Sequence, residues 1–325
     1  MLISVVIPAW NAAEYLREAI RSVLAQGHRP IEIVVVDDGS TDHTRQVCES
    51  FGAQVRYIFQ ENDGTKGGGA RARGIREARG ELIALLDQDD RWLPTKIERQ
   101  LAALEAHPGA GIVFTRARTI DGAGRLTDAR EDLPGGAVSM SAREAFHLLL
   151  TENPFCPSSA LVRREVVGAL LSTDPRTVGC GDWELWFSVA REHPVVVLDE
   201  ALTDYRVSAE QFCANKDQLA SSMLLTLRQQ RSRFHEGCAE CERSYRAGLW
   251  HVSDVFAVAA RNYLDDYHAA ARGGRPLGAL RSLRLALRAA PREVMRPRRV
   301  LAVCKNFASS TVTATKRLIH AGAHR

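Results

Sequence analysis

Three carboxylates, those of Asp87, Asp89 and Asp90, are crowded together directly after the apolar run 82–86. Their mutual repulsion is unfavourable beside a buried strand unless a cation compensates it. Hard oxygen ligands favour Mg²⁺ or Mn²⁺, which commonly complete their coordination with waters and substrate phosphates. The spacing therefore predicts a divalent metal site. The alternative is an exposed acidic turn ahead of the helix that follows Pro94.

Strand patterns and helix patterns alternate around this segment, and the strands and helices that they predict must position it. Apolar runs rich in β-branched residues predict strands at 3–7, 31–36, 55–59, 82–86 and 112–115. Apolar residues at helical spacing predict helices at 12–26, 40–50, 70–79 and 94–106. Continuous apolar strands that alternate with helices are typical of a mostly parallel sheet with helices on both faces. The predicted fold class is therefore α/β.

The residues after each strand matter most, because ligands of open parallel sheets bind at the carboxyl ends of the strands. The first strand ends in Pro8-Ala9-Trp10-Asn11 and the second in Asp37-Asp38-Gly39. Neither segment is the G-x-G-x-x-G turn of dinucleotide-binding proteins, and the sequence G-x-x-x-x-G-K-[ST] of nucleoside triphosphatases is absent. These two classes of function are therefore not expected.

Five segments occur in a characteristic order: V-V-I-P-A-W-N, V-V-V-D-D-G-S-T-D, N-D-G followed by A-R-A-R-G, L-L-D-Q-D-D, and G-D-W-E-L-W. In this combination the chain resembles the family 2 glycosyltransferases, inverting nucleotide-sugar enzymes with the GT-A fold. The resemblance covers roughly residues 2–210. We expect a GT-A-like domain over 1–215, and helical periodicity predicts a helical, basic region over 216–325.

The resemblance implies a nucleotide-sugar site made by Pro8, Ala9, Trp10, Asn11, Asp38, Lys66, Arg71, Asp87, Gln88 and Asp89. The first-strand motif would flank the nucleotide base, and Asp38 would accept a hydrogen bond from it. Asp89 and Asp90 match the metal ligands of the family, with Asp89 the better candidate and Mn²⁺ or Mg²⁺ the cofactor. Lys66 and Arg71 lie around a glycine stretch longer than the family pattern, and they are interchangeable candidates for contacting the diphosphate.

Inverting transfer needs a base that removes the proton of the acceptor hydroxyl. The resemblance assigns this role to Asp182, at the start of a helix whose dipole favours an ionised carboxylate. A helix N-cap is the alternative role of Asp182. The chain departs from the family pattern at Gly181, which replaces Glu, and at Ser208, which replaces His. The first departure bears on acceptor recognition and the second on metal affinity.

The charges of the chain are unevenly distributed, although its net charge is only +4. Residues 272–325 contain 13 Lys and Arg, and Glu293 is their one acidic residue. A basic amphipathic helix in this tail can lie on an anionic membrane surface or dock onto its own domain. Because the tail has few aromatic residues for base stacking, nucleic acid is not an expected partner.

No apolar run approaches the ~18 residues that cross a bilayer, and the N-terminus lacks a signal-peptide pattern. The seven cysteines are scattered, which favours reduced thiols and a cytoplasmic location. His235, Cys238 and Cys241 have a spacing compatible with zinc. A tetrahedral site needs a fourth ligand, for which only His251 or Cys213 is a candidate, so reduced thiols without metal are the alternative.

The sequence thus predicts a metal-dependent glycosyltransferase that uses a nucleoside diphosphate sugar, with UDP favoured, and inverts the sugar linkage. The acceptor would be a glycan or a lipid-linked molecule in cell-surface polysaccharide synthesis, with peripheral contact to the inner membrane face through the basic helices. A non-catalytic nucleotide-sugar-binding protein is one alternative, to which Gly181 and Ser208 point. A sugar nucleotidyltransferase is the other, although a Gly-rich loop after the first strand is missing.

Overall fold

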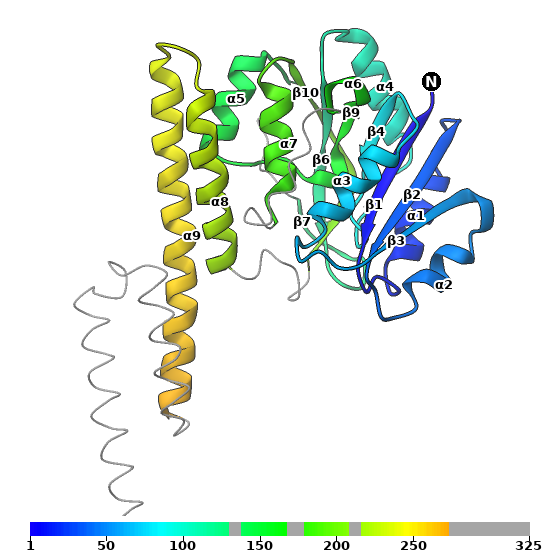
Figure 1. The fold of residues 1–325 in the computed structure, drawn as a ribbon, viewed down its shortest axis with the longest axis horizontal. Helices are drawn as coiled ribbons and strands as arrows, with labels where there is room; N and C mark the ends of the chain where they lie inside the picture. Colours follow the sequence, from blue (N-terminus) through cyan, green and yellow to red (C-terminus); the bar gives the residue numbers. More distant parts are fainter. Residues whose placement is uncertain (130–137, 168–178, 208–215, 273–325) are drawn as a thin grey trace, which may run out of the picture. The chain divides into compact units, whose positions relative to one another are not determined.

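The computed structural model describes residues 1–129, 138–167, 179–207 and 216–272 (Figure 1). Ser208, Cys213 and the basic tail after residue 272 lie outside the described residues. The predicted membrane contact of that tail therefore stays a prediction. Within the described ranges, no helix combines the length and the apolar character needed to cross a membrane.

Contacts between residues divide the chain into two units. One unit comprises Met1–Ala214 together with Ser222–Gly248, and the other comprises Asn215–Ser221 together with Leu249–Arg325. The sheet and the strand ends that carry the predicted site residues belong to the first unit. The predicted domain boundary after residue 215 stays a prediction.

In the described residues the strands form one mixed sheet, with the order β3-β2-β1-β4-β9-β6-β10-β5, and with β7 beside β6 and β8 beside β10. β3, β2, β1 and β4 run parallel, whereas β9 is antiparallel to β4 and β6. The predicted α/β class is confirmed, and the mostly parallel arrangement holds for these first four strands. The strand bounds are β1 (Ile3–Ala9), β2 (Ile31–Asp38), β3 (Val55–Gln60), β4 (Leu82–Leu85), β5 (Arg91–Trp92), β6 (Ile112–Ile120), β7 (Leu126–Ala129), β8 (Val138–Met140), β9 (Leu161–Arg163) and β10 (Val195–Arg206).

The helices α1 to α4 follow the strands as the apolar spacing predicts, and short 3₁₀ turns join some of the elements. α1 and α4 pack on one face of the sheet, and α3 packs on the other face, on β1 and β2. The helix bounds are α1 (Leu16–Leu24), α2 (Thr44–Glu49), α3 (Gly68–Glu77), α4 (Lys96–Ala106), α5 (Ala142–Thr151), α6 (Arg164–Val167), α7 (Gly181–Ala190), α8 (Lys216–Gln230) and α9 (Ala239–Arg272), with 3₁₀ turns η1 (Gly52–Gln54), η2 (Pro157–Ser159) and η5 (Arg231–Arg233).

Close packing of α3 on the sheet positions one of the predicted site residues. Successive residues of β1 point to opposite faces, so Ile3 and Ile7 join the core under α1 while Val6 faces α3. At Gly74 of α3, an added Cβ would lie 2.3 Å from Val6 Cγ1. The missing side chain lets α3 lie directly on β1. This contact brings Arg71, one turn earlier on the helix, beside Asp87 after β4.

Aromatic side chains fill the core between β6 and helices α5 and α7. Phe114 of β6 stacks on Phe155 with ring centroids 4.1 Å apart, and it meets Trp186 of α7 edge-on at 4.9 Å. The indole N–H of Trp183 donates to the Leu149 carbonyl of α5 at 3.1 Å. These contacts hold α7, and with it the predicted base at its start, against α5.

Lys96, the first residue of α4, is a fully buried cation. Its ammonium donates to Gln100 Oε1 at 2.8 Å and lies 4.2 Å from the centroid of the Trp92 ring. Burial lowers the pKa of Lys96 to about 7, because removal from water disfavours the charged form. The protonation of Lys96 is therefore linked to the free energy of unfolding.

Lys96→Met should remove a pH-dependent part of the stability. The unfolded chain keeps the Lys96 proton up to a pKa of 10.5, whereas the folded chain releases it near pH 7, so the unfolded state binds more protons between these values. From this group the wild type gains up to about 1.4 kcal/mol of unfolding free energy per unit as pH rises through that window. We expect urea unfolding at pH 7, 8 and 9 to show that the unfolding free energy of the wild type rises relative to that of Lys96→Met. If the unfolding free energies of the two proteins change in parallel with pH, this expectation is contradicted.

Candidate functional site

The carboxyl ends of β1, β2 and β4 lie side by side at one edge of the sheet. β1 pairs in parallel with both neighbours, with Ala9 opposite Asp37 of β2 and Val6 opposite Leu85 of β4. Pro8 and Ala9 are buried residues of β1 itself. The polar segments that follow the strands therefore meet at this edge, as predicted for 8–11, 37–42 and 87–90.

The end of β1 presents an exposed indole ring on a well-fixed backbone. The side-chain amide of Gln88 accepts from the Trp10 N–H at 2.7 Å and donates to the Trp10 carbonyl at 3.2 Å. Asn11, at a φ of 46°, accepts through Oδ1 from the Thr41 N–H at 2.9 Å. Trp10 is 50% exposed, and Lys66 Nζ lies 5.8 Å from its ring centroid. Gln88 and Asn11 thus hold the loops, while Trp10 and Lys66 offer a ligand a flat face and a cation.

Asp38 is buried between the ends of β2 and β3. Its carboxylate accepts from Gln60 Nε2 at 2.7 Å and from Asn62 Nδ2 at 3.3 Å. Burial raises the pKa of Asp38, and the hydrogen bond from Gln60 opposes that rise. The two amides fix the Asp38 carboxylate at the edge of the sheet. Gln60 was not among the predicted site residues, because nothing in its type or spacing distinguishes it from an ordinary strand residue.

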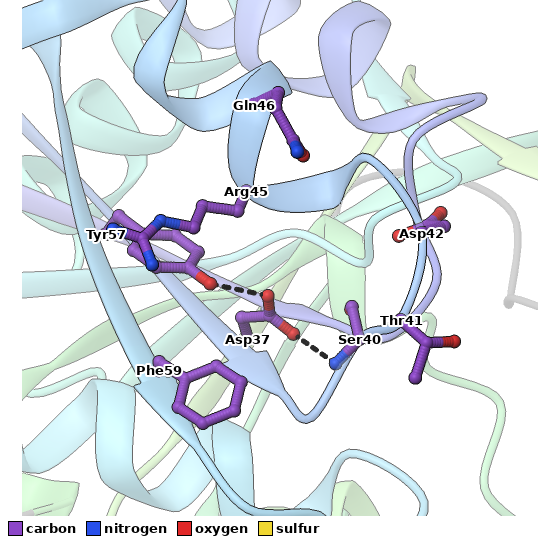
Figure 2. A pocket seen from close by; sticks show the side chains of 8 residues that line it. All are labelled: Asp37, Ser40, Thr41, Asp42, Arg45, Gln46, Tyr57 and Phe59. Atoms are coloured by element: carbon purple, nitrogen blue, oxygen red, sulfur yellow. Dashed lines mark hydrogen bonds between the residues drawn. The ribbon is translucent and has the colours of Figure 1, made fainter.

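A pocket of about 290 Å³ opens beside β2 and α2 (Figure 2). Asp37 accepts there from the Tyr57 hydroxyl at 2.7 Å and from the Ser40 N–H at 2.8 Å. Neighbouring residues of a strand point to opposite faces, and Asp37 rather than Asp38 lines this pocket. None of the predicted site residues lines it, since its walls are Asp37, Ser40, Thr41, Asp42, Arg45, Gln46, Tyr57 and Phe59.

Arg71 of α3 pairs with the Asp87 carboxylate and interacts electrostatically with that of Asp182, which comes from a distant part of the chain. Its Nη2 donates to Asp87 Oδ1 at 2.6 Å, and the Asp87 N–H donates to Ser158 Oγ at 2.9 Å. Burial lowers the pKa of Arg71, but the charges of Asp87 and Asp182 raise it by more. Arg71 therefore stays charged. It occupies a different place from Lys66 beside Trp10, so the two cations that the sequence left interchangeable are separated in the structure.

Asp90 points into the protein interior, which the sequence prediction of a metal ligand did not anticipate. It is 1% exposed, and its oxygens accept from the Ser158 hydroxyl at 2.5 Å and from the Arg206 backbone N–H at 2.9 Å. Burial raises the pKa of Asp90 well above its usual value, and the charges of Asp89 and Asp87 add to the rise. Both Asp90 oxygens thus serve the fold, and the geometry favours Asp89 over Asp90 as the ligand.

Arg206, the last residue of β10, holds the acidic segment in place. Its guanidinium donates to the Asp89 carbonyl at 2.7 Å, to the Asp121 carbonyl at 3.0 Å and to the Glu18 carboxylate at 2.6 Å. It also lies 4.4 Å from the centroid of the Tyr15 ring. Sequence reasoning missed this role, because the contacts of Arg206 join segments far apart in the chain.

Asp182 lies in the first turn of α7, and Cys180 occupies the N-cap position of that helix. The Asp182 carboxylate accepts from Asn153 Nδ2 at 3.0 Å. Burial raises the pKa of Asp182, whereas Arg71 and Asn153 lower it. A secluded carboxylate with a raised pKa, close to a cation, is a candidate general base. Asn153 was not predicted as a site residue.

Gly181, where the family pattern has Glu, begins α7 beside the beginning of α3. A Cβ at this position would lie 4.0 Å from Gly68 Cα, which is an ordinary contact. Packing therefore does not require a glycine there. The effect of Gly181 on acceptor recognition stays a prediction.

The α/β fold, with carboxylates gathered at the ends of parallel strands, defines a protein of the GT-A type. Residues 4–171, about half of the chain, match the model of Glycosyl transferase family 2. The chain therefore belongs to glycosyltransferase family 2, as its motifs predict.

Relatives with known sequences share this region. An uncharacterized glycosyltransferase of Nostoc sp. is 36% identical over 220 residues, which cover 64% of this chain and 65% of that protein. TuaG of Bacillus subtilis, whose name connects it with teichuronic acid biosynthesis, is 36% identical over 104 residues, covering 31% of this chain and 40% of TuaG. The matches with this chain thus span less than two thirds of the length of these relatives.

Two solved structures share the fold. Staphylococcus aureus TarS 1–349 in complex with UDP-GlcNAc has a TM-score of 0.59 at 16% identity, covering 89% of this chain and 93% of that one. The mannosyltransferase PcManGT from Pyrobaculum calidifontis, in complex with GDP-Man and Mn²⁺, has a TM-score of 0.56 at 19% identity. The match covers 97% of this chain and 86% of that one. At these identities the likeness concerns the fold, and it confirms the predicted GT-A architecture.

Arg71→Met should destabilise the protein more at neutral than at acid pH. Without the guanidinium, the pKa of Asp182 rises further, so the folded state binds a proton that the unfolded state has released, and stability falls as pH rises above about 4. We expect a loss of about 2 kcal/mol at pH 7.5 and a smaller loss at pH 5, measured by urea unfolding.

Arg76→Met, a matched change at an exposed position of the same helix, should alter stability by less than about 0.5 kcal/mol at either pH. Equal losses for Arg71→Met at pH 5 and pH 7.5 would show that the guanidinium does not compensate the two carboxylates.

Proposed function

We propose that this protein transfers a sugar from a nucleoside diphosphate sugar, most favourably a UDP-sugar, to an acceptor hydroxyl with inversion at the anomeric carbon. The observation that carries the proposal is that Arg71 pairs with Asp87 of the acidic segment and also interacts electrostatically with Asp182 of α7. These interactions support a single site that contains both the candidate diphosphate end and the candidate base. The exposed face of Trp10 supplies a surface for the nucleotide base at the same sheet edge.

In the proposed reaction the acceptor oxygen forms a bond to the anomeric carbon while the bond from that carbon to the diphosphate oxygen breaks. The leaving diphosphate takes the electron pair, and the proton of the acceptor hydroxyl goes to the carboxylate of Asp182. The raised pKa of Asp182 makes its carboxylate a stronger base than an ordinary aspartate, and Asn153 orients that carboxylate through the hydrogen bond at 3.0 Å.

The carboxylate ligands of the acidic segment suit a hard divalent cation. Asp89 offers a partly exposed carboxylate on a backbone that Arg206 holds, and carboxylate oxygen is the ligand that Mg²⁺ and Mn²⁺ prefer. When bound, Mn²⁺ or Mg²⁺ neutralises charge on the leaving diphosphate. The Mn²⁺ complex of PcManGT supports this choice of metal.

For the acceptor we propose a glycan or a lipid-linked glycan used in cell-surface polysaccharide synthesis. The name of TuaG supports this class of product, and the UDP-GlcNAc complex of TarS supports a UDP-sugar donor. The 13 Lys and Arg of residues 272–325 would bring the protein to an anionic membrane surface, where a lipid-linked acceptor is found.

A thermal-shift series with UDP, GDP, dTDP, CDP and ADP, each with and without Mn²⁺, tests the donor site. We expect UDP with Mn²⁺ to raise Tm, since a ligand at one hundred times its Kd adds about 2.7 kcal/mol to the stability of the folded state. Asp89→Ala should lose the Mn²⁺-dependent part of the shift, and Asp254→Ala, an exposed position on α9, should keep it. If no nucleotide shifts the wild-type Tm, the donor site is refuted.

Asp182→Asn tests the base. We expect kcat for sugar transfer to fall by about 10²–10⁴, because the amide cannot accept the acceptor proton, while the UDP-dependent Tm shift remains. Asp199→Asn, a change at a partly exposed carboxylate of β10, should keep kcat within about twofold. Binding of UDP by the wild type without transfer or donor hydrolysis would favour the non-catalytic nucleotide-sugar-binding alternative.

A further inference from the structure

A second group of possible metal ligands lies in the helical part of the first unit. His235 and Cys238 lie between η5 and α9, Cys241 lies in the first turn of α9, and His147 of α5 completes the group. One ligand atom from each of the four residues lies within 4.8 Å of all the others. The fourth residue of the group, which the sequence spacing did not identify, is thus His147. His251 is not part of the group.

The distances within this group match those of a tetrahedral metal site. His147 Nε2 lies 3.4 Å from Cys238 Sγ and 3.4 Å from Cys241 Sγ, and His235 Nδ1 lies 3.3 Å from Cys241 Sγ. Zinc–sulfur and zinc–nitrogen bonds of usual length at tetrahedral angles separate nitrogen and sulfur ligands by about 3.5 Å. One imidazole nitrogen that faces two sulfurs at similar distances is better explained by a shared cation than by a single hydrogen bond.

The chemistry of the donors selects the ion. Two thiols and two imidazoles suit zinc, whereas Mg²⁺ and Mn²⁺ prefer oxygen. Cys241 is buried and the other three residues are half-buried, so solvent has limited access.

We propose that His147, His235, Cys238 and Cys241 bind one structural Zn²⁺ ion. Four protein ligands fill a tetrahedral shell and leave no open position for a substrate, so the site stabilises the fold and performs no chemistry. The ion would tie α5 to the segment that joins η5 and α9. This site is separate in place and in ligand type from the acidic segment around Asp89.

The helix that carries His147 also supports the candidate base. Leu149 of α5 accepts a hydrogen bond from Trp183 of α7, and Asn153, just after α5, donates to Asp182. On the other side, a Cβ at Gly248 of α9 would lie 2.0 Å from the Leu150 carbonyl, so α9 packs directly against the end of α5. Zinc would therefore stabilise the support of Asp182 without touching the reacting atoms.

Metal analysis of the full-length protein tests the proposal without any activity measurement. We expect about one zinc per chain after Zn²⁺ reconstitution and gel filtration. Cys241→Ala and His147→Gln should each lose the bound zinc. Cys48→Ala, at a buried cysteine outside the group, and His251→Gln, at the sequence-based candidate, should both keep it.

Cobalt substitution of the wild type keeps the test decisive if the variants fail to fold. Bound Co²⁺ should give intense tetrahedral visible bands with thiolate-to-cobalt charge transfer, which an all-oxygen site around Asp89 cannot produce. Removal of zinc by a chelator should lower Tm, and Zn²⁺ added back should restore it. The proposal is overturned if the wild type binds no zinc, or if its mass is lower by two hydrogen atoms because Cys238 and Cys241 form a disulfide. Neither result would affect the proposed sugar transfer.

Discussion

Compensation of charge at the sheet edge is the constraint on which the candidate site depends. Asp87 and Asp182 come from different parts of the chain, and the positive charge of Arg71 acts on both of them. Like charges held close together in a secluded place repel strongly unless an opposite charge lies among them. α3 can supply that charge because Gly74 lets it lie directly on β1. One close contact between a helix and a sheet thus allows the acidic segment and the candidate base to share a site.

The acidic segment 87–90 contains residues that support the fold as well as the candidate metal ligand. Asp90 turns inward to accept from Ser158 and from the Arg206 backbone, and the Arg206 side chain holds the Asp89 carbonyl. Gln88 uses its amide on the Trp10 backbone. A motif read as a row of ligands therefore contains residues whose polar atoms are already satisfied by the protein. This internal support fixes the backbone that carries the Asp89 carboxylate.

Local patterns were enough to predict the first half of the fold. The apolar runs before Trp10, Asp38 and Asp87 end within two residues of the ends of their strands, and the parallel pairing of these strands explains why the ends meet. The antiparallel insertion of β9 between β4 and β6 was not predictable, because strand pairing depends on contacts far apart in sequence. The same reason explains why Ser158 and Asn153 were missed, since each acts only through a distant partner.

The proposed zinc site shows what long-range contact adds to a motif. Residues 4–171, which match the family model, contain His147, whereas His235, Cys238 and Cys241 lie beyond that region. An ion shared by these four side chains would join the family region to a helical segment that the family match does not cover. Because thiolate and imidazole ligands disfavour the hard cations that carboxylates prefer, the two sites differ in the ion that they favour. Each ion then has a separate task, since Asp89 would hold the cation of the reaction and the zinc would hold the helix beside Asp182.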